Sequence, residues 1–442
     1  MGAARRIYKN TLYLGVAEIV SKVLQFVIML YAARILDKEY FGRFSFALSL
    51  SLIAIVLADL GINTLLVREI SRNRNLASKY FFNAFSIKVL LSFVTYFIIM
   101  VILNILDYPN DTRRIVYIIW LFTILSTFTE LFYSIFRAFE MMIYDAFLKI
   151  LRMIMLTFAS LYVLFKGYGV FVFSYMFAFV EIIIVLVALV IALKSFIKLK
   201  VVLDYSFAKA ILKKALPFGF AFVFGSIYFF IGSVMLSKIK GDAEVAVYSV
   251  AYNLILAILF IPTVYTNAIY PVLSRYYKES KSGLRVLYEK SFKYLYIIGL
   301  PISIGLYLLA GRIIFFFYGE IYADSIIALQ IISWYLFIKF INFLFGTVLS
   351  SINREVFLFV IYYWYVSKNL YFYNFLVILI KPIMGVIVMA FFIKFLNFGL
   401  ILTILFSALV YSISLFTLKA FDKEDYKIIK KLFENEKLPK DI

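Results

Sequence analysis

The chain has 442 residues, of which 65% are hydrophobic and only 16% charged, and its mean hydropathy is +0.98. Soluble globular domains are close to half apolar, so this composition excludes a soluble protein and indicates a chain that crosses a lipid bilayer many times. The net charge of +20 does not indicate a nucleic-acid partner, because Lys and Arg stand in short segments between apolar runs rather than on one soluble patch.

The chain contains no Cys and no His. This excludes disulfides, thiolate or imidazole ligands for a metal, and Ser-His or Cys-His catalytic pairs. We therefore expect no cofactor, no metal site and no catalytic residue. Carboxylates and water would have to carry any proton that moves through the protein.

Apolar windows long enough to span a membrane follow one another along the chain, since about 20 residues suffice. A charged segment, 194–214, divides them and is long enough to form an amphipathic connector on the membrane surface. Residues 419–442 have mixed charge and predict a cytoplasmic tail. The windows before the connector are 11–33, 40–63, 80–105, 115–136, 150–166 and 168–193, and those after it are 215–238, 246–272, 294–317, 324–351, 356–378, 380–396 and 398–418.

Basic residues concentrate in alternate loops, and the loops on the side of the N-terminus hold most of them. The positive-inside rule therefore places the N-terminus and the connector in the cytoplasm, which predicts a multi-pass protein of the cytoplasmic membrane. The windows found are odd in number, which would leave the tail outside. We predict an all-α polytopic membrane protein with about 12–14 transmembrane helices, and the count after residue 355 stays open.

An internal repeat indicates two lobes. Without a gap, Gly15 and Phe26 in the first window align with Gly219 and Phe230 in the first window after the connector. The offset equals six helices and both copies begin in the cytoplasm, so the repeat predicts two parallel lobes around a central cavity. The predicted parts are an N-lobe at 1–193, the connector at 194–214, a C-lobe at 215–418 and the tail.

Ionisable side chains inside the apolar windows are the candidate site, because a charge that faces lipid costs roughly 3 kcal/mol and is kept where it meets a partner or water. In the first window, Glu18, Lys22 and Gln25 fall on one helix face, and Glu18 stands one turn from Lys22. Two interpretations stay open. The pair either lines a cavity, where substrate or a coupling ion breaks it, or joins two helices permanently.

The other candidates lie in later windows. Glu130 and Arg137 share one polar stripe, which we interpret as a hydrated wall rather than as helix-to-helix contact alone. Asp59 lies near Asn63 close to the cytoplasmic end of its window, and it is either a further functional acid or a partner of Arg68. The remaining candidates for the cavity, substrate binding or ion coupling are Glu181, predicted to act with the other acids, and Lys339 and Asn342 of the C-lobe, where a cation would attract a phosphate-bearing substrate.

Several long motifs resemble one family. They include "EYFGRFSFALSLSLIAIVLADLGINTLLVREISRN" (39–73), "ELFYSIFRAFEMMIYDAFLKI" (130–150) and "MLSKIKGDAEVAVYSVAYNLI" (235–255). They are similar to the Wzx-type polysaccharide flippases of the multidrug/oligosaccharidyl-lipid/polysaccharide exporter superfamily. This resemblance implies a MATE-like pair of lobes and a transporter rather than an enzyme. It also implies a lipid-linked oligosaccharide of the polyprenyl pyrophosphate or phosphate type as substrate, and polysaccharide-assembly enzymes as partners in the bilayer.

Alternatives remain at this point. One is a cation-coupled multidrug or metabolite exporter of the same superfamily, and another is a membrane component of a polysaccharide-assembly complex that transports nothing. Coupling of a flippase to H⁺ or Na⁺ is also open. A membrane glycosyltransferase or polymerase is disfavoured, because such enzymes generally need a large extramembrane loop with acidic catalytic residues, and the predicted outer loops are only a few residues long.

Overall fold

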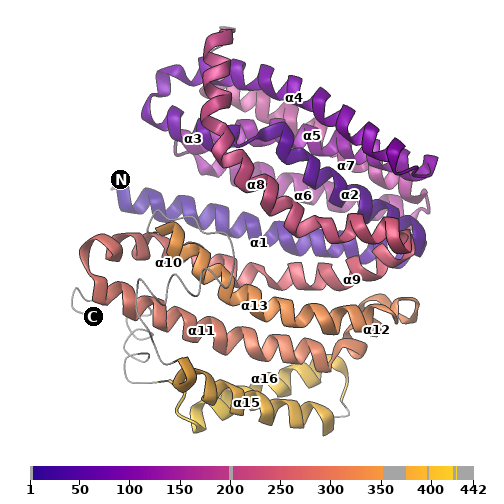
Figure 1. Cartoon of the computed structure of the whole chain (residues 1–442), viewed down its shortest axis with the longest axis vertical. Coiled ribbons are helices and arrows are strands. Elements are labelled where there is room, and N and C mark those ends of the chain that lie inside the picture. Colours follow the sequence, from indigo (N-terminus) through magenta and orange to yellow (C-terminus); the bar gives the residue numbers. More distant parts are fainter. Residues whose placement is uncertain (1–2, 199–202, 352–374, 396–397, 422–424, 426–442) are drawn as a thin grey trace. The chain divides into compact units, whose positions relative to one another are not determined.

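The structure is a computed structural model that describes residues 3–198, 203–351, 375–395 and 398–421 together with Asp425. Every regular element in these residues is a helix, which confirms the predicted all-α class (Figure 1). Most of the predicted window 356–378 and of the predicted tail lies outside the described residues. The number of helices after residue 355 therefore stays a prediction.

The chain is a multi-pass membrane protein. In the part that the structure describes, 11 helical segments are long and apolar enough to cross a membrane. These segments are Tyr13–Ile35, Lys38–Asp59, Arg74–Ile105, Asn110–Ala138, Met142–Phe165, Gly169–Ser195, Phe222–Lys240, Asp242–Tyr277, Lys281–Leu308, Ser325–Val348 and Leu400–Thr417.

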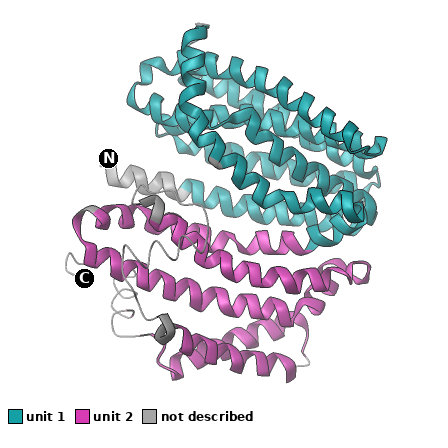
Figure 2. Ribbon diagram, viewed as in Figure 1, with its two compact units in different colours: residues 1–250 teal, residues 251–442 magenta. Residues whose placement is uncertain are grey.

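The helices form two compact units, residues 1–250 and residues 251–442 (Figure 2). Within the first unit, α1 packs on α6, α5 packs on α7, and α2 packs on both α5 and α8. The helices of this unit are α1 (Ala3–Ile35), α2 (Lys38–Asp59), α3 (Ile62–Arg72), η1 (Arg74–Leu76), α4 (Ala77–Ile105), α5 (Asn110–Ala138), α6 (Met142–Phe165), α7 (Gly169–Ser195), α8 (Tyr205–Lys240) and the first turns of α9 (Asp242–Ile258).

The second unit is built around α11, which packs against α13 and α15, while α15 packs against α16. Its helices are the end of α9, then α10 (Phe260–Glu279), α11 (Lys281–Leu308), α12 (Ala310–Tyr318), η2 (Glu320–Tyr322), α13 (Ser325–Ser351), α15 (Phe375–Phe395) and α16 (Leu400–Thr417). The predicted window 294–317 is thus divided between α11 and α12.

The predicted window 40–63 does not form one helix. α2 ends at Asp59, Leu60 and Gly61 both take left-handed backbone conformations with φ of 45° and 78°, and the short amphipathic helix α3 follows. A Cβ at Gly61 would lie 2.6 Å from the Cβ of Phe218 and 2.8 Å from the carbonyl oxygen of Ala215. Only glycine therefore fits between α2, α3 and α8 at this point.

The start of α2 also lies close to the end of α8. A Cβ at Gly42 of α2 would lie 1.7 Å from the carbonyl oxygen of Asp242, which begins α9 directly after α8. Glycines at both ends of α2 thus permit close backbone contact with α8 and the start of α9, which together we call the α8 hairpin.

Part of the predicted connector 194–214 forms the first turns of α8. Asp204 caps this helix by accepting a hydrogen bond from the backbone N–H of Phe207 at 3.0 Å. Lys79 Nζ donates to the same carboxylate at 2.9 Å, and Asp204 N–H donates to Asn83 Oδ1 at 2.9 Å. The hydrogen bonds from Lys79 and from the Phe207 backbone lower the pKa of Asp204 below its ordinary value. These contacts attach the start of α8 to α4.

Candidate functional site

Glu181 on α7 is paired with side chains of two other helices. Its side chain is completely buried, Thr129 Oγ1 of α5 donates to it at 2.6 Å, and Arg152 of α6 forms an ion pair with it at 3.7 Å. A buried carboxylate requires such partners, because an unpaired charge in a low-dielectric interior is very costly. Sequence reasoning missed Arg152, although a single Arg inside the predicted window 150–166 was the available signal.

Glu130 and Arg137, predicted on one stripe of α5, do contact each other. Arg137 Nη2 donates to Glu130 at 3.3 Å, and Arg137 Nε donates to Asp145 of α6 at 2.6 Å. Asp145 is completely buried and also pairs with Lys149 at 3.2 Å. The structure thus adds Asp145 and Lys149, two residues that the sequence analysis did not select.

The predicted pair on α1 is present. Lys22 Nζ lies 4.0 Å from Glu18 Oε1, and both side chains are close to half exposed. Gln25 is exposed on the same helix. Arg152 also interacts electrostatically with Glu18 and Glu130. Three predicted acids, Glu18, Glu130 and Glu181, therefore share the field of one arginine, and we call these four residues the Arg152 cluster.

Asp59 belongs to a different group. Its partner is Lys88 of α4, whose Nζ lies 2.6 Å from Asp59 Oδ1 and also donates to the carbonyl oxygen of Thr127 at 3.2 Å. The Lys88 side chain is completely buried. Arg68, proposed from sequence as a partner of Asp59, instead pairs with Glu69 at 2.8 Å. Lys88 was another missed residue, and its position inside an otherwise apolar window could have revealed it.

The remaining predicted residues lie on α3 and α13. Asn63 on α3 has a buried Oδ1 without a hydrogen-bond partner among the described residues, and so has Asn342 on α13. Lys339, also on α13, lies with its Nζ 5.4 Å from the ring centroid of Tyr335. Lys339 and Asn342 belong to the second unit.

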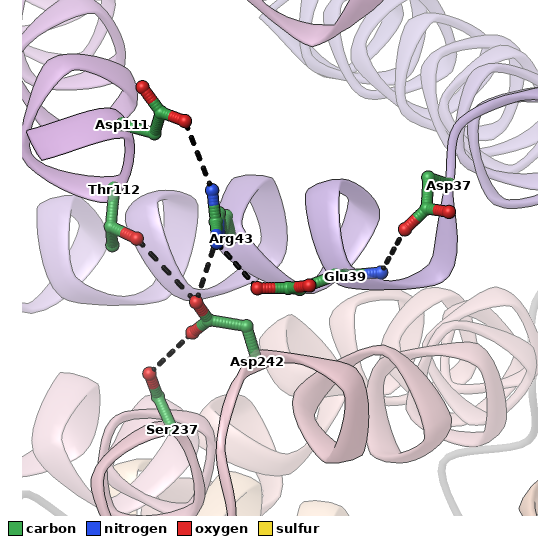
Figure 3. Close-up of polar contacts among 7 residues, drawn as sticks. All are labelled: Asp37, Glu39, Arg43, Asp111, Thr112, Ser237 and Asp242. Atoms are coloured by element: carbon green, nitrogen blue, oxygen red, sulfur yellow. Dashed lines mark hydrogen bonds and ion pairs between the residues drawn. The ribbon is translucent and has the colours of Figure 1, made fainter. Parts of the chain in front are cut away.

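A second polar network lies where α2, α5 and the α8–α9 junction meet (Figure 3). Arg43 of α2 pairs with Glu39 at 2.5 Å, with Asp111 of α5 at 3.4 Å and with Asp242 at 3.3 Å. Asp242 also accepts hydrogen bonds from Ser237 at 2.8 Å and from Thr112 at 3.5 Å. Arg43 was not among the site residues predicted from the sequence.

Spanning helices that form two compact units and hold buried ion pairs define a multi-pass helical membrane protein. The chain belongs to the polysaccharide biosynthesis protein family, whose sequence profile matches residues 7–277. The MatE family profile matches residues 217–372. The resemblance expected from the motifs is therefore confirmed.

Solved structures share the fold. The lipid II flippase MurJ in an inward closed conformation is 16% identical, with a TM-score of 0.72, and the match covers 91% of this chain and 97% of that one. An inward-facing multidrug resistance MATE transporter of the MOP superfamily is 16% identical, with a TM-score of 0.60 and coverage of 89% and 95%. A MATE transporter of Vibrio cholerae is 14% identical, with a TM-score of 0.54 and coverage of 94% and 97%. No curated protein matches the chain.

Proposed function

We propose that the chain is a flippase that moves a lipid-linked oligosaccharide or polysaccharide repeat unit across the cytoplasmic membrane by alternating access, coupled to H⁺ or Na⁺. Family membership and the transporter fold support this function. The observation that carries it is the Arg152 cluster, in which Arg152 pairs with Glu181 and interacts electrostatically with Glu130 and Glu18 within membrane-spanning helices.

The cost of a charge in lipid indicates what surrounds the Arg152 cluster. A charged side chain facing lipid costs roughly 3 kcal/mol, so intramembrane charges almost always face a partner, a water-filled cavity or a polar substrate. Glu181 is sealed inside the bundle, whereas Glu130 and Glu18 keep 39% and 45% of their side-chain surface exposed. We infer that the two partly exposed acids face a hydrated route and that Arg152 links them to the buried one. A cation entering this route would compete with Arg152 for the carboxylates.

The two contacts of α2 with the α8 hairpin fit alternating access. In the proposed arrangement α2 belongs to the N-lobe, 1–193, and α8 to the C-lobe, 215–418, with 194–214 as a cytoplasmic connector and the N-terminus in the cytoplasm. The network of Arg43 then closes the outer end, and the contact of Gly61 with α8 closes the cytoplasmic end. Each contact would separate in turn as the lobes rock. Because of these contacts α8 falls in the same compact unit as α2.

An apolar groove in the second unit supports a lipid-linked substrate. The groove has a volume of about 510 Å³, lies among α11, α12, α15 and α16, and is lined almost entirely by apolar side chains, including Pro301, Leu306, Met389, Ile404 and Phe416. A cavity of this size with so few polar groups suits a hydrocarbon chain. We propose that it holds the polyprenyl tail while the sugar follows the polar route, and that polysaccharide-assembly enzymes supply the substrate.

The proposal is tested in vesicles that contain a short-chain polyprenyl pyrophosphate oligosaccharide in both leaflets. A membrane-impermeant glycan-modifying enzyme should reach the inner-leaflet pool only when the protein is present. Replacing Glu18, Glu130 and Glu181 together by Gln should remove the dependence on an ion gradient, and Glu279→Gln, which changes an exposed residue of α10 paired with Arg275, is the matched control. Equal accessibility with and without the protein would refute the function.

A cation-coupled exporter of small molecules is a second candidate, because the MatE profile also matches the chain. The same acids would then bind a proton or sodium ion in exchange for a soluble cation. Gradient-driven accumulation of a cationic dye in these vesicles, without any change in lipid accessibility, would favour this exporter over the flippase.

A further inference from the structure

Asp425 is held by an unusually dense set of donors from one helix. Its carboxylate is completely buried and pairs with Lys293 Nζ and, at 3.1 Å, with Lys290 Nζ, while the hydroxyl of Tyr294 donates to it at 2.9 Å. Two ammonium groups and one hydroxyl of α11 therefore converge on a single carboxylate. Converging charged and neutral donors of this kind are how proteins bind phosphate oxygens.

These donors stand at one end of the apolar groove. Ile297 and Ile298 line the groove one helical turn beyond Lys293 and Tyr294 on α11. Phe421 also lines the groove, and Lys293 Nζ lies 5.9 Å from the centroid of its ring. The apolar groove and the three donors of α11 therefore lie next to each other along one helix. An apolar groove beside cationic donors matches a hydrocarbon chain that ends in a phosphate.

We propose that Lys290, Lys293 and Tyr294 bind the phosphate of the lipid-linked substrate, and that Asp425 is an internal competitor that occupies this site when no lipid is bound. This inference rests on the proposed function, because it takes the groove as the site of the polyprenyl tail. In the proposed orientation the start of α11 is cytoplasmic, so the phosphate site lies where a lipid loaded from the cytoplasmic leaflet carries its head group.

The competition has a defined energetic consequence. A lipid phosphate can occupy the lysines only when Asp425 leaves them, so the apparent affinity is reduced by the fraction of molecules in which Asp425 is displaced. Removing the carboxylate also leaves two cations without this partner, which should lower the stability of the lipid-free protein. A bound phosphate should restore that stability, because a ligand that binds only the folded state stabilises it.

The experiment measures displacement of a fluorescent short-chain polyprenyl phosphate from the full chain in neutral phosphatidylcholine nanodiscs. Asp425→Asn should bind the probe about tenfold more tightly than the unchanged protein. Lys290→Gln with Lys293→Gln in the Asp425→Asn background should reverse this gain. Glu279→Gln is the control for an unrelated carboxylate, and the uncharged polyprenol, which should bind all variants alike, is the control for the tail.

A second measurement guards against misfolded variants. Polyprenyl phosphate should raise the thermal unfolding midpoint of the Asp425→Asn protein more than that of the unchanged protein. The inference is overturned if Asp425→Asn leaves the affinity for the phosphate probe unchanged, or if polyprenol binding changes as much as phosphate binding. It is also overturned if phosphatidylglycerol displaces the probe with equal affinity, since the lysines would then bind bulk anionic lipid.

These results are separable from the proposed function. Tighter phosphate binding by Asp425→Asn without any movement of lipid between leaflets would refute the flippase and leave the phosphate site standing. Lipid movement with no response to Asp425 would refute only the internal competitor.

Discussion

Arg43 Nε donates to Asp242 Oδ2 at 3.3 Å and so joins α2 to the start of α9 across 199 positions of sequence. The backbone contact between Gly42 and Asp242 lies directly beside this bond. Polar and backbone contacts therefore coincide at the start of α2, where the proposed lobes would have to separate.

We expect Arg43→Ala to loosen this junction. Thr112 is completely buried beside Asp242, and because the chain has no Cys, Thr112→Cys supplies a single reporter thiol. Arg43→Ala should raise the rate at which a membrane-impermeant maleimide labels this thiol by about fivefold, as expected for an ion-pair contribution of about 1 kcal/mol. Arg113→Ala, which removes the exposed pair with Asp107, is the control. Equal labelling rates for both variants would contradict the role of Arg43.

Arg152 and Glu181 should behave as one coupled pair. Arg152→Met leaves the carboxylate buried without its cation, and removing one partner of a buried pair costs about 3–5 kcal/mol. Adding Glu181→Gln should recover much of this loss, because the second substitution removes the uncompensated charge. Thermal unfolding of the two single variants and the double variant in detergent gives the coupling energy. Additive effects of the two substitutions would show that the pair is not coupled.

Gly61 and Gly167 provide a matched comparison of backbone strain and close packing. Both have left-handed backbones, with φ of 78° and 73°, but a Cβ at Gly61 meets α8 whereas a Cβ at Gly167 meets nothing within 4 Å. Gly167→Ala should cost roughly 1–2 kcal/mol through strain alone. Gly61→Ala should cost about 1–3 kcal/mol more through overpacking. If Gly61→Ala and Gly167→Ala lose similar unfolding free energy, α8 moves aside easily to make room for the added methyl group.

The cap of α8 should make stability depend on pH. The Lys79 contact holds the pKa of Asp204 below its ordinary value, so this stabilisation is fully present above about pH 4 and disappears as the pH falls through the lowered pKa. Asp204→Asn should therefore reduce the loss in thermal unfolding midpoint between pH 7 and lower pH. Asp107→Asn, another exposed carboxylate variant, should keep the full loss. If both variants lose as much as the unchanged protein, the Asp204 cap contributes nothing.

The sequence by itself located most of the helical segments that are long and apolar enough to cross a membrane, because the apolar length of a segment can be read from that segment alone. It also identified Glu18, Glu130, Arg137 and Glu181, since a charge in an apolar run is visible without any knowledge of its neighbours. Only the tertiary structure decided their partners. Arg152 reaches Glu181, Asp145 reaches Arg137 and Lys88 reaches Asp59, each from another helix, and helix periodicity relates residues of one helix only.

Tertiary structure also decided where α2 ends. Asp59 to Asn63 reads as the continuation of an apolar window, but the backbone turns at Leu60 and Gly61 because α8 approaches closely enough to exclude any side chain at Gly61. Likewise, the attachment of Asp425 to α11 joins positions 132 residues apart. The pairing of distant segments depends on how whole helices pack, and hydropathy does not encode that packing.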